Sequence, residues 1–153
     1  MRAADGASAS LQVLLVEDNT GDVRLMQEAF RDAGRPVTLH VASDGVEAIE
    51  FLRRAPPFAG VPRPDLILLD LNMPRMTGLE VLAAIKQDNG LKMIPAIIFT
   101  TSDQNEDILN SYVLNANCFL RKPVELDGFA TVVKSITDFW LTKAKLPPQG
   151  PRT

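Results

Sequence analysis

The sequence predicts an α/β fold, a doubly wound five-stranded parallel sheet with five helices. Two observations favour it: short apolar runs alternate with segments of helical periodicity, and the third run, LILL, lacks the polar alternation of a half-exposed strand. Parallel strands need crossovers that place helices on both faces of the sheet. The 153 residues fit one domain, which we expect over residues 11–146 between disordered segments at 1–10 and 147–153.

Five short apolar runs are the predicted strands. Each run is bounded by polar or turn-forming residues, and each is too short to form a helix of ordinary length. A loop rich in proline at residues 55–65 separates the second helix from the third strand. The predicted strands cover residues 11–16, 37–42, 66–69, 96–99 and 118–120.

Helices are predicted between the strands and after the last one. The first has apolar side chains at helical spacing over Val23–Phe30 and ends at Gly34. The next three begin with an acceptor side chain followed three positions later by glutamate, a capping pattern found at Asp44–Glu47, Thr77–Glu80 and Asp103–Glu106. The last helix carries apolar residues at Phe129, Val132, Val133, Ile136, Phe139 and Trp140.

The composition limits the classes of partner. The net charge is −3 and the 16 Lys and Arg residues are scattered, which argues against nucleic-acid binding. The apolar runs fall far short of the roughly 20 residues that span a bilayer, and residues 1–10 lack the apolar core of a signal peptide. A lone cysteine, Cys118, forms no internal disulfide. We therefore expect a cytoplasmic protein that binds neither nucleic acid nor membrane.

Acidic residues follow the first and third predicted strands. Glu17 and Asp18 end the first strand, and Asp70 ends the third. Ligands of an open parallel sheet bind beyond the carboxyl ends of its strands, so these side chains are expected to meet. Three carboxylates at one point repel one another unless a hard cation takes their oxygens, which implies Mg²⁺.

The other strand ends complete a site suited to phosphoryl chemistry. A carboxylate beside Mg²⁺ can attack phosphorus, and Asp70 is the best placed because it ends the most buried strand. Lys122, after the fifth strand, would neutralise charge on the phosphate. The hydroxyl of Thr100, at the end of the fourth, would donate to a phosphoryl oxygen and detect the modification.

The motifs VLLVEDN, DLNMP, FTTS and RKP, in this order, resemble those of a response-regulator receiver domain over about residues 11–141. The resemblance implies the flavodoxin-like (CheY-like) topology and a phosphoryl group accepted by Asp70 from a phosphohistidine on a sensor histidine kinase. It implies Mg²⁺ held by Asp18, Asp70 and the backbone carbonyl of Asn72, with Glu17 reaching the ion through water. Such a protein is a phosphoacceptor with self-phosphorylation and self-dephosphorylation chemistry, not a turnover enzyme.

The resemblance also implies a switch. Thr100 would be coupled to an aromatic residue on the last strand, here Phe119, which turns inward on phosphorylation; the phenylalanine lacks the hydroxyl of the commoner tyrosine. The Lys122–Pro123 peptide bond is expected to be cis, as is general in such domains. From their placement two residues past key positions, Asn72 and Ser102 are predicted to flank the attacking water and set how quickly the phosphoryl group is lost.

A finer resemblance concerns the Pro-rich loop and the segments SYVLNANCFLRKPVEL and FWLTKAKLP. Together they are similar to the single-domain regulators paired with bacterial phytochrome kinases. This implies a kinase of phytochrome type as partner and a homodimer through the last two helices and the last strand. The candidate interface residues are Tyr112, Phe139 and Trp140, two of which add apolar surface to the last helix.

Three other functions compete with this one. A phosphatase of haloacid-dehalogenase type needs an acid two residues after the nucleophile, where Asn72 stands. A flavin-binding protein of similar topology needs phosphate donors after the first strand, where Glu17 and Asp18 would repel the ligand. A receiver-like interaction module that is never phosphorylated remains open from the sequence alone.

Overall fold

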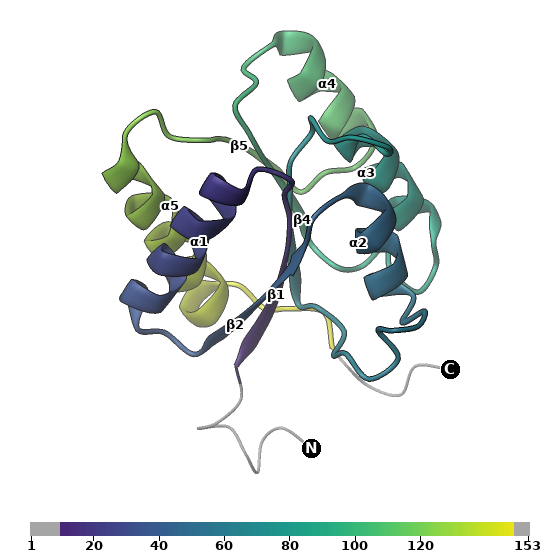
Figure 1. Ribbon diagram of the computed structural model, residues 1–153, viewed down its shortest axis with the longest axis horizontal. Helices are drawn as coiled ribbons and strands as arrows, with labels where there is room; N and C mark the ends of the chain where they lie inside the picture. The colour runs from purple at the N-terminus through teal and green to yellow at the C-terminus, as the bar shows by residue number, and fades with distance from the viewer. Residues whose placement is uncertain (1–9, 149–153) are drawn as a thin grey trace.

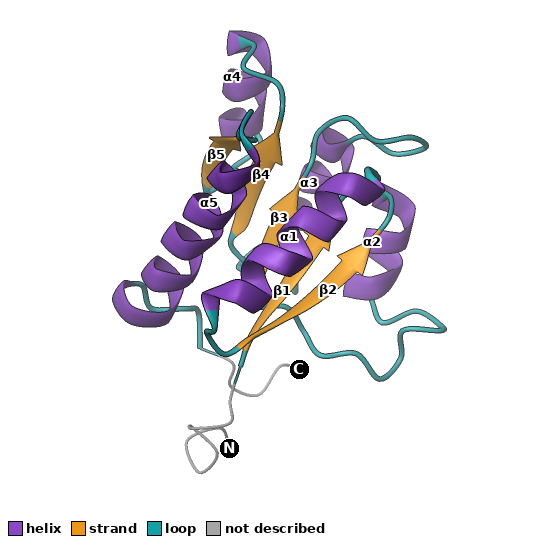
Figure 2. Ribbon diagram, turned by 60° about the vertical axis from the view of Figure 1, so that its left-hand side comes forward, coloured by secondary structure: helices purple, strands orange, loops and turns teal. Residues whose placement is uncertain are grey.

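A computed structural model describes residues 10–148 and contains one sheet of five parallel strands in the order β2-β1-β3-β4-β5. This confirms the predicted fold class and its topology, in which the strand order reverses beside β1. Figure 2 shows the strands side by side with their arrowheads at one edge of the sheet. The strands are β1 (Leu11–Val16), β2 (Val37–Ala42), β3 (Leu66–Leu69), β4 (Ala96–Thr100) and β5 (Cys118–Arg121).

Helices cover both faces of the sheet, as parallel connections require (Figure 1). Two of them, α1 and α5, lie together on one face, and the other three lie on the opposite face. A π-helical turn, η2 (Phe139–Lys143), continues directly from the last helix. The helices are α1 (Thr20–Ala33), α2 (Gly45–Leu52), α3 (Gly78–Gln87), α4 (Asn105–Val113) and α5 (Leu126–Asp138).

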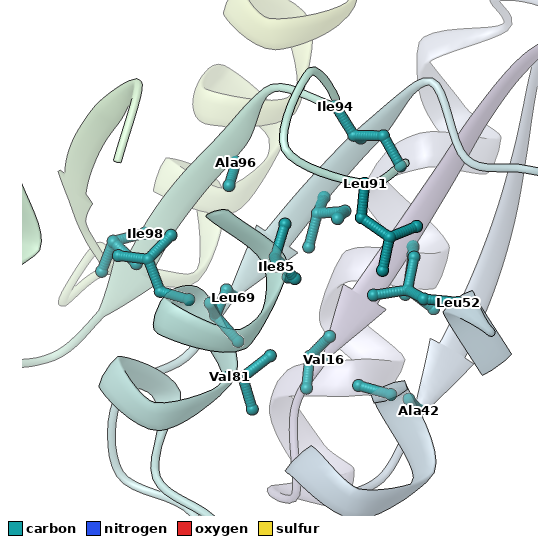
Figure 3. Close-up of a cluster of buried hydrophobic side chains, with 14 of the residues drawn as sticks. Val16, Ala42, Leu52, Leu69, Val81, Ile85, Leu91, Ile94, Ala96 and Ile98 are labelled. Atoms are coloured by element: carbon teal, nitrogen blue, oxygen red, sulfur yellow. The ribbon is translucent and has the colours of Figure 1, made fainter. Parts of the chain in front are cut away.

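Alternate residues of the central strands supply two apolar layers. Along β3, Leu66 and Leu68 face the layer beneath α1 and α5, and Ile67 and Leu69 face the layer beneath α2 and α3. All four are fully buried, which explains the uninterrupted apolar run. Figure 3 shows the α2 and α3 layer, where Val81 and Ile85 of α3 reach toward the strands. This packing holds the strand ends, and thus the site, in place.

Local signals explain where several helices begin and end. Gly34 closes α1 in the left-handed conformation, with a φ of 64° that suits glycine. Thr77 and Glu80 form the predicted capping box at the start of α3. Asp44 caps α2 by accepting from the Glu47 amide, but the Glu47 carboxylate accepts from the Ser43 amide, one residue earlier than a capping box requires.

The predicted cap of α4 is wrong. The helix begins at Asn105, and its N-cap residue, Gln104, makes no side-chain cap hydrogen bond. Asp103 instead pairs with Arg121 of β5 at 3.3 Å. Its side chain therefore makes a long-range ion pair and does not cap the helix.

The expected cis peptide bond before Pro123 is also not found. Within residues 10–148 the cis peptide bond joins Pro56 and Pro57, and the Lys122–Pro123 bond is trans.

The ends of the chain are only partly described. The Ser10 hydroxyl bonds that of Thr38 at 2.7 Å, and Leu146 packs against the α1 and α5 layer. Of the predicted disordered segments, residues 1–9 and 149–153 lie outside the described residues, whereas Ser10, Pro147 and Pro148 are described. Among residues 10–148, the helices are too short or too polar to cross a bilayer.

Candidate functional site

The three predicted acids meet at the carboxyl edge of the sheet. Glu17 and Asp18 follow β1, and Asp70 follows β3, which pairs directly with β1. The Asp70 amide donates to the Val16 carbonyl at 3.1 Å, so the two strand ends are joined where the acids begin. One carboxylate oxygen from each acid lies within 4.8 Å of the others. The prediction that the strand topology gathers these side chains is confirmed.

Asp70 is held in a closely packed position. Its side chain is 7% exposed, and its Oδ1 accepts from the Leu71 amide at 2.9 Å. The first residue of α3, Gly78, lies so close that a Cβ there would come within 2.1 Å of the Asp70 carbonyl oxygen. Glycine therefore permits α3 to pack against the backbone of Asp70, and any larger residue would displace the helix or the acid.

Glu17 is the most deeply buried of the three acids. Burial raises the pKa of its carboxyl to about 7, and the neighbouring charge of Asp70 adds to the effect. The Lys122 ammonium, 2.6 Å from Oε1, and the Asn19 amide, 3.2 Å from Oε2, oppose this rise in pKa without cancelling it. The carboxylates around Lys122 outnumber the single ammonium that faces them.

Lys122 reaches the acids from the end of β5. Its amide donates to the Thr100 carbonyl at 2.6 Å, which aligns it with β4, and its side chain is 5% exposed. The ammonium lies 2.6 Å from Glu17, 2.9 Å from Asp22 and 3.7 Å from Asp70. Burial alone would lower the pKa of Lys122, but the hydrogen bonds to Glu17 and Asp22 outweigh it and the pKa is raised.

The donor set suits a hard divalent cation. Mg²⁺ prefers carboxylate, carbonyl and water oxygens, and it neutralises acids that would otherwise repel one another. Asp18 is exposed and Asp70 is buried, so an ion bound by both would sit at the mouth of the pocket. The pocket is open to solvent and is lined by Glu17, Asp18, Asn19, Thr20, Asp22, Asp70, Asn72, Thr101 and Lys122.

Thr100 and Ser102 occupy different surroundings. Thr100 is fully buried at the end of β4, and its hydroxyl oxygen accepts from the Ser102 amide at 3.4 Å. The Ser102 hydroxyl donates to Asp107 of α4 at 2.6 Å and accepts from the Gln104 amide at 3.2 Å. Thr101, between them, lines the acidic pocket. Ser102 therefore organises the turn before α4.

Comparison with known proteins decides the family. Residues 13–134 match the family described as "Response regulator receiver domain". The chain belongs to this receiver family. It is 41% identical over 144 residues to the response regulator Rcp1 of Synechocystis sp. (strain ATCC 27184 / PCC 6803 / Kazusa), and the match covers 94% of this chain and 98% of Rcp1.

Solved receivers have the same fold. The phosphorylated cyanobacterial phytochrome response regulator RcpA superposes with a TM-score of 0.87 at 45% identity, covering 92% of this chain and 100% of RcpA. The Mn²⁺-bound form of Rcp1 superposes with a TM-score of 0.84 at 42% identity, covering 90% and 99%. The receiver described here is thus a response regulator related to those of phytochrome-linked two-component signalling.

The predicted switch residue of the receiver lies on the edge strand. Phe119 is half-buried and packs against the α2 and α3 layer, and its amide donates to the Tyr112 hydroxyl at 3.2 Å. Tyr112, on α4, is 47% exposed. The Tyr112 side chain therefore links α4 to β5 at the surface.

The three predicted interface residues do not form one group. Phe139 is 52% exposed, whereas Trp140 is half-buried against the α1 and α5 layer and meets the Phe139 ring edge-on at 5.4 Å. Both belong to η2, which follows the far end of α5, and α5 runs away from α4 in Figure 2. Tyr112 thus lies in a different part of the receiver surface.

Sequence reasoning missed Asp22, which makes an ion pair with Lys122 from the first turn of α1. No short-range pattern marked it, because Asp18 lies before the N-cap residue Asn19 and is not part of α1. The partner of Asp22, Lys122, is 100 residues away in the sequence. Thr101 was also missed, since strand alternation does not show which residue after β4 faces the pocket.

Proposed function

We propose that this receiver accepts a phosphoryl group on Asp70 from a phosphohistidine of a sensor histidine kinase of phytochrome type, with Mg²⁺ in the acidic pocket. The observation that carries the proposal is the arrangement at the end of β3: a buried carboxylate, two further acids within 4.8 Å and an ammonium at 3.7 Å. The similarity to Rcp1 and RcpA supports the kinase class.

The transfer is a displacement at phosphorus. A carboxylate oxygen of Asp70 attacks the phosphorus, the bond from phosphorus to the histidine nitrogen breaks, and its electron pair returns to the imidazole, which takes up a proton from water. Mg²⁺ held by Asp18, Asp70 and the Asn72 carbonyl, with Glu17 through water, would offset charge on the transferring oxygens. Lys122 donates to one phosphoryl oxygen, and the Thr100 hydroxyl donates to another.

Hydrolysis of the acyl phosphate resets the receiver. Water attacks phosphorus, the bond to the Asp70 oxygen breaks, and inorganic phosphate leaves while Asp70 returns to a carboxylate. Asn72 lines the pocket and can orient this water, which supports its predicted influence on the lifetime. Ser102 is predicted to flank the same water, although its hydroxyl bonds Asp107 and the residue does not line the pocket. Dephosphorylation rates of the Asn72→Ala and Ser102→Ala variants test both roles.

The output surface is proposed at α4, β5 and the end of α5. Movement of Thr100 toward a phosphoryl group would draw Phe119 inward and break its amide contact with the Tyr112 hydroxyl. The exposed side chains of Leu109, Tyr112 and Val113 on α4 supply apolar surface for a partner, whereas Phe139 on η2 is exposed in a different part of the surface. A monomeric mass by light scattering at high concentration, with and without phosphorylation, would refute the homodimer.

Intact mass spectrometry tests the phosphoryl transfer. The wild type, Asp70→Asn and the control Asp32→Asn, an exposed acid on α1, are incubated with a small-molecule phosphoryl donor and Mg²⁺ or EDTA. We expect one added phosphoryl group on the wild type and the control with Mg²⁺, and none on Asp70→Asn. If no protein is modified, even by a phytochrome-type kinase, the chain is an unphosphorylated interaction module instead.

A further inference from the structure

Asp22 contributes a fourth carboxylate that faces the lysine of the acidic pocket. It lies in the first turn of α1, where its amide donates to the capping side chain of Asn19 at 2.9 Å. Its Oδ2 accepts from the Lys122 ammonium at 2.9 Å, across 100 residues of sequence. The helix N-terminus favours a negative charge at this position. Asp22 is therefore a fixed, charged partner for Lys122 that the transfer reaction does not itself require.

The ammonium of Lys122 is drawn toward Asp22 and Glu17, away from the phosphoacceptor. An ammonium has three donors, and two of them serve Glu17 at 2.6 Å and Asp22 at 2.9 Å. The oxygen of Asp70 lies at 3.7 Å, beyond ordinary hydrogen-bond length. A phosphoryl group on Asp70 would bring strong acceptor oxygens to the same ammonium, so one of the existing partners must give way.

Asp22 is the partner that can release the lysine at the lower cost. Its side chain is 23% exposed, compared with 1% for Glu17. After losing Lys122, the Asp22 carboxylate would be stabilised by water and by the start of α1. The Glu17 side chain has almost no access to water, so water cannot replace its bond to Lys122 and the loss is more costly.

Building on the proposed phosphoryl transfer to Asp70, we propose that Asp22 is a positioning residue that competes with the phosphoryl group for Lys122. It holds the ammonium in the unphosphorylated receiver and releases it when Asp70 is modified. The carboxylate thereby stabilises the unphosphorylated state relative to the phosphorylated one. Removing its charge shifts the balance between phosphorylation and dephosphorylation toward the phosphorylated protein.

The first test compares four proteins: wild type, Asp22→Asn, Asp22→Glu and Glu28→Gln. Glu28 is exposed on the same helix and lies outside the pocket lining, so its variant matches the change in charge. With a small-molecule donor and Mg²⁺, the ratio of phosphorylation to dephosphorylation rates should rise about fivefold in Asp22→Asn, as for an ion pair of roughly 1 kcal/mol. Asp22→Glu, which retains the carboxylate, and Glu28→Gln should stay near the wild-type ratio.

The second readout needs neither phosphate nor metal. In EDTA, the side-chain nitrogen signal of Lys122, assigned by its loss in Lys122→Arg, should shift in Asp22→Asn and not in Glu28→Gln. An altered rate ratio without this shift would mean a general effect of charge and overturn the proposal, as would the shift with an unchanged ratio. If the wild type accepts no phosphoryl group, the proposed transfer fails, and with it the competition, while the Lys122 signal still reports the contact.

Discussion

The centre of the sheet and its β5 edge are built differently. Every residue of β3 is buried, whereas β5 has no buried residue, and Ser111 is the one buried residue of α4 beside it. Asp70 of the acidic pocket lies at the end of β3, in the centre of the sheet. The proposed output surface lies at the β5 edge. Regions with few buried contacts open at low free energy, so the edge can rearrange while the site keeps its geometry.

The largest expected effect on stability compares a cation inside the acidic pocket with its neighbour at the exposed end of β5. Lys122 is 5% exposed among acids, whereas the Arg121 and Asp103 side chains of the adjacent pair are 56% and 61% exposed. In EDTA, Lys122→Met should lower the free energy of unfolding by roughly 3–5 kcal/mol, because it leaves buried carboxylates unpaired.

The control variant, Arg121→Ala, should lower the free energy of unfolding by less than about 1 kcal/mol. Urea denaturation of both variants in the same buffer measures the difference. Added Mg²⁺ should restore part of the stability lost in Lys122→Met and have no such effect on Arg121→Ala, because the cation replaces the missing positive charge only in the pocket. Equal losses in the two variants would show that Lys122 stabilises the fold no more than an exposed ion pair does.

A second comparison uses two leucines. Leu68 of β3 is fully buried, and Leu109 of α4 is 64% exposed. Leu68→Ala should cost roughly 3 kcal/mol of stability, from lost apolar burial and the cavity left between the strand and α1 and α5. Leu109→Ala should change stability by no more than about 0.5 kcal/mol. A loss in Leu109→Ala comparable to that in Leu68→Ala, measured by thermal unfolding, would mean that α4 is anchored as firmly as the sheet.

The central region was also the part that the sequence predicted best. Asp70 and Glu17 could be placed because parallel topology alone brings the carboxyl ends of neighbouring strands together. The apolar run of β3 needs no knowledge of distant partners, since burial on both faces removes any alternation. The capping box at Thr77 and Glu80 likewise depends on residues three positions apart.

Predictions failed where a distant partner decides the outcome. Asp103 had the local pattern of a helix cap, yet Arg121 takes its carboxylate. Asp22 could not be assigned to the pocket because its contact with Lys122 depends on how α1 is oriented over the sheet. The π-helical turn at Phe139–Lys143 continues an apolar pattern that reads as ordinary helix. For Asp103 and Asp22, a contact with a residue far away in the sequence, which short-range spacing does not encode, determines the outcome.

The smallest effect concerns how α3 and α4 begin. Thr77 caps α3 beside Asp70 with a reciprocal pair of hydrogen bonds, whereas Gln104 precedes α4 without a side-chain cap. Thr77→Ala should therefore cost about 1 kcal/mol of stability, and Gln104→Ala should cost close to nothing. Amide exchange should quicken in the first turn of α3 in Thr77→Ala and remain unchanged in α4 of Gln104→Ala. A larger loss from Gln104→Ala than from Thr77→Ala would show that α4 begins as firmly as α3, contrary to the contrast between the buried centre and the exposed edge.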